Sequence, residues 1–229
     1  AAPRSAPAAW LEAWLRANGA AAAALDGVLE EVPFPNEPGV VRVLADALPA
    51  GALLAVASSM PIRDVDAFLP ARPSPLRLLG NRGAAGIDGF LSTGFGAAAA
   101  HPGPACLLAG DLSALHDLTA LGMAARLGIK ATVVVVHNDG GGIFHFLPQA
   151  AFPEHFERHW GTPHGTDFVA VAAALGVPAR RVQTRRELAE AVAATPDGPR
   201  LLEVRTDRAE NFALHRRLRR AVEEALAAL

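Results

Sequence analysis

The sequence predicts an α/β fold, a mostly parallel sheet with helices on both faces, preceded by a linker helix. Short apolar runs alternate with Ala-rich or amphipathic segments of helical length. The runs are apolar throughout, which is typical of strands that are covered on both faces. No internal repeat or long low-complexity segment interrupts this order. The expected strands are residues 52–58, 76–80, 105–110, 131–136 and 200–206.

Composition and charge narrow the class of protein. The chain has 229 residues, 51% of them hydrophobic, and a formal net charge of −2, so it can bury a sizeable core, and its near-neutral charge argues against binding nucleic acid. No apolar run approaches the roughly 20 residues of a membrane span, and no signal-peptide pattern opens the chain. We therefore expect a globular cytoplasmic protein. Cys106 is the only cysteine and lies in an apolar run, so a packed core thiol is expected.

A helix is expected before the sheet. From Trp10, apolar residues recur at helical spacing, and the Pro- and Gly-containing residues 32–39 end the pattern. The first residues have the composition of a linker and lack an initiating methionine, so we expect a piece of a larger protein. Residues 1–37 are assigned to an N-terminal linker and helix, and residues 38–229 to the sheet domain.

The residues with distinctive chemistry follow the expected strands. In a parallel α/β sheet, ligands bind beyond the carboxyl ends of the strands, where loops meet helix N-termini. The motifs at these positions are "SSMPIRD" (58–64), "GNRGAAGIDG" (80–89), "GDLSALHD" (110–117) and "HNDGGGIF" (137–144). The functional site is therefore expected at this edge of the sheet.

The last two motifs predict a metal site. Asp111 ends one strand, a helix over 112–127 crosses back, and Asn138 ends the next strand, so carboxylate and amide reach the same edge. Their oxygens are hard ligands suited to Mg²⁺. Glycines 140–142 permit positive φ, so that a main-chain carbonyl can face the metal while amides face a phosphate. The helix N-terminus after Asp111 also favours negative charge. Together these residues predict a pocket for a metal-bridged diphosphate.

This arrangement resembles the cofactor fingerprint of thiamine-diphosphate enzymes, in which Gly-Asp is followed, after such an interval, by a pair of asparagines. The resemblance implies thiamine diphosphate as the cofactor, with Mg²⁺ held by Asp111, Asn138 and the carbonyl of Gly140. Mn²⁺ is an alternative metal. The sequence departs in one place, because His137 stands where the family has the first asparagine. The departure concerns a cofactor contact rather than the metal site.

The four motifs together, in this order and spacing, resemble the C-terminal domain of the menaquinone-pathway synthases that make 2-succinyl-5-enolpyruvyl-6-hydroxy-3-cyclohexene-1-carboxylate. The similarity extends from about Trp10 to "TDRAENFALHRRL" (206–218). These transferases decarboxylate 2-oxoglutarate on thiamine diphosphate and add the resulting succinyl carbanion to isochorismate, releasing CO₂. The resemblance therefore implies these two small-molecule substrates, and a homo-dimer or homo-tetramer in the intact enzyme.

The resemblance also implies site residues. Arg63 and Arg82 match arginines associated with the substrate carboxylates, which a guanidinium group grips bidentately. The alternative is that both arginines pair at the surface with Asp64, Asp66 or Asp88. The residues expected to bind the cofactor are Ser58, Ser59, Gly110, Leu112, Ser113, Asn138, Gly140, Gly141, Ile143 and Phe144.

Other readings of these residues stay open. Ser58 and Ser59 either cap the following helix or bond the diphosphate. Ile143 and Phe144 either lie against the cofactor or belong to the core. The stretch "GFGAAA" (94–99) mimics a dinucleotide-binding pattern, but it lies inside a helical segment, so close helix packing is expected rather than NAD binding.

Two functions of different classes follow from this reading. In the first, the chain is the diphosphate-binding domain of the synthase, whose catalytic glutamate belongs to an N-terminal pyrimidine-binding domain. That domain and the family's central domain are absent from this sequence, so the chain alone is expected to be inactive and to need the pyrimidine-binding domain of the same or another subunit. In the second, it is a non-catalytic diphosphate-binding or scaffold module of the same fold. Within the enzyme class the competitor is an acetolactate-synthase-like carboligase, but "SSMPIRD" and "NRGAAGIDG" favour the menaquinone enzyme.

Overall fold

The structure is a computed structural model that describes residues 7–71, 75–81 and 86–229. It divides into two compact units, one formed by Phe34–Phe212 and the other by Ala1–Pro33 with Ala213–Leu229. The strands are β1 (Leu53–Val56), β2 (Arg77–Gly80), β3 (Ala105–Gly110), β4 (Ala131–His137), β5 (Ala179–Arg181) and β6 (Pro199–Arg205). The helices are α1 (Ala8–Glu31), α2 (Glu37–Ala47), α3 (Met60–Phe68), α4 (Phe90–Ala100), α5 (Asp111–Leu115), α6 (Thr119–Leu127), η1 (Gly142–Phe146), η2 (Pro148–Ala151), α7 (Pro153–Phe156), η3 (Glu157–Gly161), α8 (Phe168–Ala174), α9 (Arg185–Ala193) and α10 (Arg208–Ala227).

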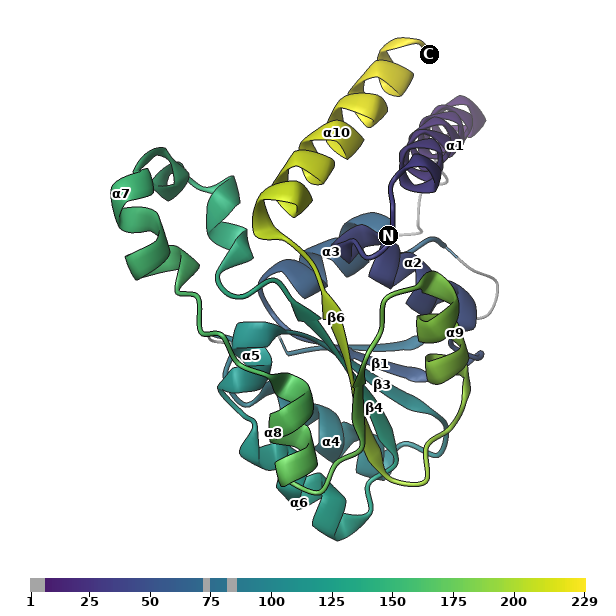
Figure 1. Cartoon of the computed structure of the whole chain (residues 1–229). Coiled ribbons are helices and arrows are strands. Elements are labelled where there is room, and N and C mark those ends of the chain that lie inside the picture. The colour runs from purple at the N-terminus through teal and green to yellow at the C-terminus, as the bar shows by residue number, and fades with distance from the viewer. Residues whose placement is uncertain (1–6, 72–74, 82–85) are drawn as a thin grey trace, which may run out of the picture. The chain divides into compact units, whose positions relative to one another are not determined.

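A six-stranded sheet forms the centre of the unit Phe34–Phe212 (Figure 1). The strand order is β2-β1-β3-β4-β6-β5, and every neighbouring pair is parallel. The predicted fold class, a parallel sheet with helices on both faces, is confirmed. From β1 the chain builds the sheet first toward β2 and then, through β3, in the opposite direction. Connections on either side of such a reversal diverge and leave a crevice at the carboxyl ends of β1 and β3.

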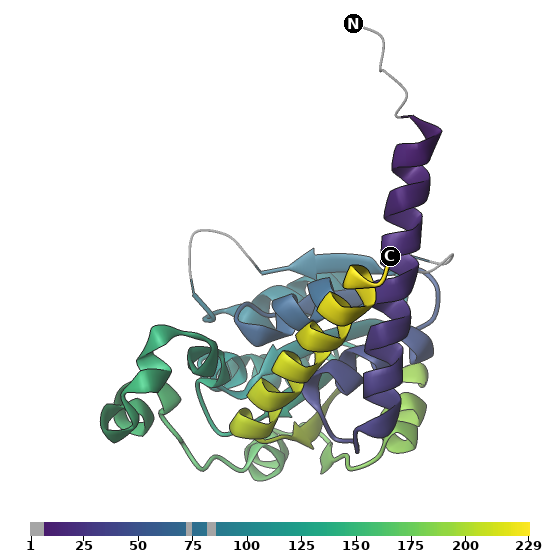
Figure 2. The same ribbon diagram turned by 90° about the horizontal axis from the view of Figure 1, so that it is seen from above.

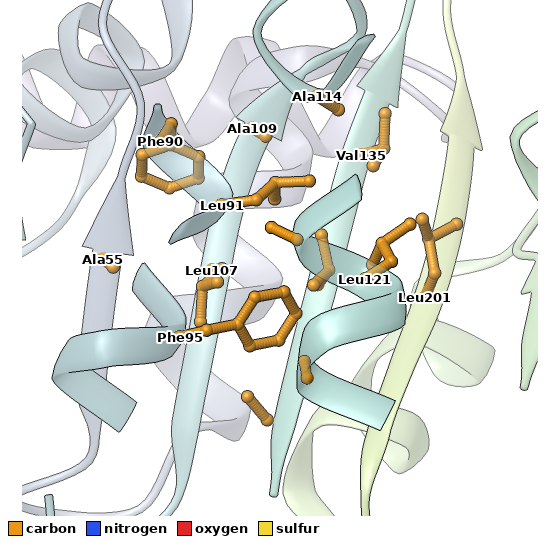
Figure 3. Close-up of a cluster of buried hydrophobic side chains, with 14 of the residues drawn as sticks. Ala55, Phe90, Leu91, Phe95, Leu107, Ala109, Ala114, Leu121, Val135 and Leu201 are labelled. Carbon is orange, nitrogen blue, oxygen red and sulfur yellow. The ribbon is translucent and has the colours of Figure 1, made fainter. Parts of the chain in front are cut away.

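Helices cover both faces of the sheet (Figure 1). On one face, Phe90, Leu91 and Phe95 of α4 pack with Leu107 of β3 and Leu121 of α6 in a cluster of fully buried side chains (Figure 3). On the other face, α2 packs against α3 and α9. Every residue of β4 is buried, which agrees with the run of four valines at its centre.

The structure corrects two expectations about these elements. The helix expected over 112–127 is two helices, α5 and α6, separated at residues 116–118. At this break Asp117 accepts hydrogen bonds from the backbone N–H and the hydroxyl of Ser92 on α4, at 2.6 and 3.0 Å, and such bonds compete with a continuous helix. The edge strand β5 was not expected, because its three residues, two of them arginines, lack an apolar run.

The second unit contains α1 and most of α10. The purple helix in Figure 2 shows that α1 is uninterrupted, although it contains Gly19 and Gly27. Glu31 of α1 and Arg217 of α10 form an ion pair within this unit. The assignment of residues 1–37 to a linker and helix stays a prediction, as does the domain over 38–229. Among the described helices, none is long and apolar enough to cross a membrane.

Gly94 allows α4 to approach β3 closely, and this contact supplies a stability test. A Cβ at Gly94 would lie 2.5 Å from Cδ2 of the buried Leu107, so Gly94→Ala is expected to lower the free energy of unfolding by about 1–3 kcal/mol through overpacking. Gly96, on the same helix, has nothing within 4 Å of such a Cβ, so Gly96→Ala is expected to raise it by about 0.5–1 kcal/mol. Urea unfolding measures both variants, and equal changes would contradict the close approach.

Candidate functional site

A cavity of about 270 Å³ lies beyond the carboxyl ends of β1, β3 and β4. This is the edge at which the sequence places the site, on both sides of the reversal in strand order. All ten residues expected to bind the cofactor line this cavity, together with the metal candidate Asp111. The remaining lining residues are Glu37, Met60, Pro61, Gly86, Ile87, Val136 and Gly142.

The wall that follows β1 contains Ser58 and Ser59. The Ser58 hydroxyl donates to the carbonyl of Asn81 at 2.8 Å. Ser59 precedes α3 with φ of 75°, yet its side chain makes no capping hydrogen bond, so neither serine caps α3. A non-glycine residue in the left-handed region costs about 1–3 kcal/mol and is typical of functional sites. The strain at Ser59 therefore lies where the backbone turns into the cavity.

Asp111 joins the ends of β3 and β4. Its buried carboxylate accepts three backbone hydrogen bonds, from Leu112 N to Oδ1 at 2.6 Å and from Asn138 N and Gly140 N to Oδ2 at 3.1 and 3.0 Å. An ionised carboxylate has about four acceptor positions, so these bonds leave capacity for a cation. The expectation that Asp111 and Asn138 lie at one edge of the sheet is thereby confirmed.

The side chain of Asn138 presents a buried oxygen without a donor. Its Nδ2 donates to Oε1 of Glu37 at 2.8 Å, whereas Oδ1 has no hydrogen-bond partner within the described part of the chain. A buried acceptor left unsatisfied costs about 1–3 kcal/mol, so an oxygen of this kind beside a cavity is a candidate ligand atom. Carboxylate, amide and carbonyl oxygens together suit a hard cation such as Mg²⁺.

The glycine run lets two backbone segments approach one another. A Cβ at Gly140 would lie 1.9 Å from the carbonyl oxygen of Gly161, and one at Gly141 would lie 2.1 Å from that of Trp160. The N–H groups of Gly140, Gly141 and Gly142 donate to Asp111, Gly161 and Gly140, respectively. These three amides are therefore engaged within the protein, which corrects the expectation that they face a phosphate.

Glu37 is a site residue that the sequence reading did not identify. It is buried in the first turn of α2, and its Oε1 accepts from Asn138 Nδ2 and, at 3.1 Å, from the Thr206 hydroxyl. Burial and then the negative charge of Asp64 raise the pKa of Glu37 to about 8. The sequence does mark a helix start here, because Asn36 followed by Glu37 and Pro38 is typical of one, and Asn36 caps α2. That signal places Glu37 in the first turn of the helix.

Two histidines, His137 and His164, lie close to the metal candidate Asp111. The His137 ring stacks on the His164 ring, with 5.3 Å between centroids, and its Nδ1 lies 2.6 Å from Oε1 of the buried Glu203. The His164 Nε2 lies 3.5 Å from Asp111 Oδ2. Together with Asp111 these rings place their ligand atoms within 4.8 Å of one another. Thr166 N–H donates to His164 Nδ1, so Nε2 carries the ring proton and is not a metal donor.

Glu203 is held in its ionised form despite complete burial. Burial alone would raise its pKa, but hydrogen bonds from His137 and Arg181 and the charge of Arg205 outweigh that effect and lower it. The His137 ring also meets Phe168 edge-on, with centroids 5.1 Å apart. His137 is thus fixed by packing and hydrogen bonding, and it is not among the cavity-lining residues.

Of the two predicted substrate arginines the structure describes Arg63, which is not among the residues that line the cavity. Arg63 is exposed on α3, lies beside a separate surface hollow, and donates from Nη1 to the Ser59 carbonyl at 2.6 Å. Arg82 lies outside the described residues. Both roles therefore stay predictions.

Comparison with known proteins identifies the family. The family model for the thiamine pyrophosphate enzyme, C-terminal TPP binding domain, matches residues 64–204. The chain belongs to this thiamine pyrophosphate family. Thiamine pyrophosphate is another name for thiamine diphosphate, so the cofactor class expected from the motifs is confirmed.

Several curated relatives of this chain are named 2-succinyl-5-enolpyruvyl-6-hydroxy-3-cyclohexene-1-carboxylate synthase. The Rubrobacter xylanophilus protein is 46% identical over 95% of this chain and 38% of its own length. The Myxococcus xanthus protein is 49% identical over 92% of this chain and 36% of its own length. The Saccharopolyspora erythraea protein is 46% identical over 99% of this chain and 41% of its own length. The resemblance inferred from the four motifs is confirmed, and the chain spans about 40% of the length of these relatives.

A solved structure supports the fold. The thiamine diphosphate-dependent 4-hydroxybenzoylformate decarboxylase of Rhodococcus jostii aligns with a TM-score of 0.61 at 24% identity, over 75% of this chain and 32% of that chain. At this identity the likeness concerns the fold alone.

His137 supplies a stability test of the histidine cluster. His137→Asn shortens the side chain, removes the ring contacts with His164 and Phe168, and weakens the bonding of buried Glu203. We expect the free energy of unfolding to fall by about 2–4 kcal/mol. His155, whose side chain is 62% exposed, supplies the control, because His155→Asn is expected to change it by less than about 0.5 kcal/mol. Equal urea-unfolding curves for both variants would contradict this account of His137.

Proposed function

We propose that this chain is the cofactor-binding part of a synthase that makes 2-succinyl-5-enolpyruvyl-6-hydroxy-3-cyclohexene-1-carboxylate from 2-oxoglutarate and isochorismate, with release of CO₂. The observation that carries the proposal is the cavity edge formed by Asp111 and Asn138, where a buried amide oxygen has no donor among the described residues. The names of the relatives support the choice of substrates.

In this proposal Asp111, Asn138 and the Gly140 carbonyl hold Mg²⁺, for which Mn²⁺ can substitute. Each atom has capacity for the cation. Asp111 has an unused acceptor position, and Asn138 Oδ1 has no donor among the described residues. The Gly140 carbonyl accepts one hydrogen bond, from Gly142 N at 2.9 Å, which leaves its second lone pair. All three ligands are oxygens, as Mg²⁺ requires.

The remaining lining residues would receive the cofactor. When bound, thiamine diphosphate supplies the electron sink that decarboxylation of a 2-oxo acid requires. Ile143 and Phe144 offer an apolar wall that excludes water from its rings. Ser59 and the N-terminus of α3 face the cavity from the opposite wall, where the positive end of the helix dipole favours the diphosphate charge.

Arg63 and Arg82 are proposed to bind the substrate carboxylates. A guanidinium group has five N–H donors, and the bond from Arg63 to the Ser59 carbonyl uses one of them. Arg63 is exposed and its partner Ser59 lines the cavity, so it would meet a carboxylate at the outer edge of the site. The proposal for Arg82 rests on the motif alone.

The catalytic glutamate is proposed to come from a pyrimidine-binding domain, in the same or another subunit of a homo-dimer or homo-tetramer. Support comes from the relatives, whose length this chain spans only in part. The cytoplasmic location expected from the sequence also stays a prediction.

Asp111 tests the metal site directly. Asp111→Asn keeps an oxygen that can accept from the backbone but removes the charge that attracts the cation, so the affinity for Mg²⁺ with thiamine diphosphate is expected to fall by about 100-fold or more. Isothermal titration calorimetry measures the affinity, and circular dichroism checks the fold. Asp66→Ala, at an exposed position on α3, is the control. An unchanged affinity in Asp111→Asn would refute the assigned ligand set.

The complete reaction tests the substrates. The 229-residue chain, supplied with Mg²⁺, thiamine diphosphate, 2-oxoglutarate and isochorismate, is expected to leave isochorismate unconsumed, since half of the enclosing surface and the glutamate are missing. Joined to the N-terminal part of the Rubrobacter xylanophilus relative, it is expected to consume isochorismate, and Asp111→Asn in the joined protein should abolish this. A joined protein that folds, binds the cofactor and leaves isochorismate untouched would contradict the proposed substrates.

A further inference from the structure

We propose that Glu37 is a positioning residue for the metal site and that it acts through Asn138. By binding the amide nitrogen of Asn138, it turns the amide oxygen toward the cation. This inference rests on the proposed function, because it assumes that the Asn138 oxygen is a metal ligand.

An asparagine amide can present either its oxygen or its nitrogen to a given point, and the two orientations differ by a half-turn of the side chain. Only the oxygen can bind a cation. The Oε1 atom of Glu37 also accepts from the Thr206 hydroxyl, so it meets Asn138 as an acceptor and pairs with the amide nitrogen, as it does at 2.8 Å. The bond therefore selects the orientation that leaves Oδ1 in the cavity without a donor from the described residues.

The surroundings hold Glu37 and the Asn138 amide in place. The Thr206 hydroxyl, which follows β6, donates to the same Glu37 oxygen at 3.1 Å. On the other side, a Cβ at Gly142 would lie 2.7 Å from Asn138 Nδ2, so glycine gives this amide the space it occupies. Segments that begin α2, end β4 and follow β6 thus meet at one buried point.

Glu37 itself is placed by the start of α2. Asn36 caps the helix through its bond with Gly39 N at 2.7 Å, and an acidic residue in the first turn is favoured by the helix dipole. A buried carboxylate away from any cation is costly. Partners that orient a metal ligand are a recognised reason to keep such a group, and their loss typically lowers metal affinity about 10–100-fold.

The test measures metal binding rather than turnover. The purified chain is titrated with Mn²⁺ in the presence of thiamine diphosphate, and free Mn²⁺ is followed by electron paramagnetic resonance. Glu37→Ala is expected to weaken Mn²⁺ binding about 10–100-fold. Glu37→Gln keeps a carbonyl that can accept from Asn138 Nδ2 and should stay within about 5-fold of the parent chain. Glu37→Asp keeps a carboxyl group but withdraws its oxygens by one methylene, so it should bind as weakly as Glu37→Ala.

Controls separate this role from a purely structural one. Glu190→Ala removes an exposed carboxylate on α9 and should bind Mn²⁺ as the parent does. Urea unfolding without metal is measured for every variant. If Glu37→Ala does not fold, the Mn²⁺ affinity of Glu37→Asp is the test of the inference. Parent-like Mn²⁺ affinity in Glu37→Asp or Glu37→Ala, with or without lost stability, would overturn the inference, as would a Glu37→Gln variant as weak as alanine. A parent chain that binds no Mn²⁺ would instead refute the proposed function, and this inference with it.

Discussion

The carboxylate of Asp111 is the contact on which the site depends. It accepts backbone hydrogen bonds from both its own helix and the loop after β4, so one buried group fixes the separation of two strand ends. The loop can follow this path because Asp139, with φ of 60°, and Gly140, with φ of 138°, adopt left-handed backbone conformations. The bond from Gly141 N to the Gly161 carbonyl, at 2.7 Å, then joins this loop to the end of η3. Without Asp111 these bonds would lose their common acceptor.

The same edge of the sheet concentrates features that cost stability. A strained Ser59, an Asn138 oxygen that has no donor among the described residues, and a buried Glu37 with a raised pKa lie around one cavity. The core cluster contains no comparable feature among its described members, and its side chains from α4, α6, β3 and β4 are buried. Natural proteins tend to break local rules of stability at functional sites and to compensate elsewhere. The cavity edge therefore has the energetic character of a ligand-binding site.

The sequence predicted the parts of this site that follow from strand ends. β3 is apolar throughout and β4 contains a run of four valines, so the ends of both strands, and hence Asp111 and Asn138, could be located from the pattern. Glu37 could not be found this way, because it lies 101 positions from Asn138 and meets it only through tertiary packing. The break between α5 and α6 also coincides with a contact between distant segments, because Asp117 accepts from Ser92, which lies 25 positions away. Contacts between segments that are distant in the sequence therefore determine the features that hydrophobic periodicity and motif spacing do not predict.

The departure of His137 from the family fingerprint is explained by the same geometry. Val136 and Asn138 line the cavity, whereas His137 between them does not, because successive side chains of a strand face opposite sides. On its own side His137 meets Glu203, His164 and Phe168. The histidine therefore alters the packing around His164, which lies next to Asp111. It does not alter the set of residues that line the cavity. A histidine can occupy this position because Glu203, held ionised by Arg181 of the neighbouring β5 and by Arg205 of its own strand, provides the acceptor that its ring needs.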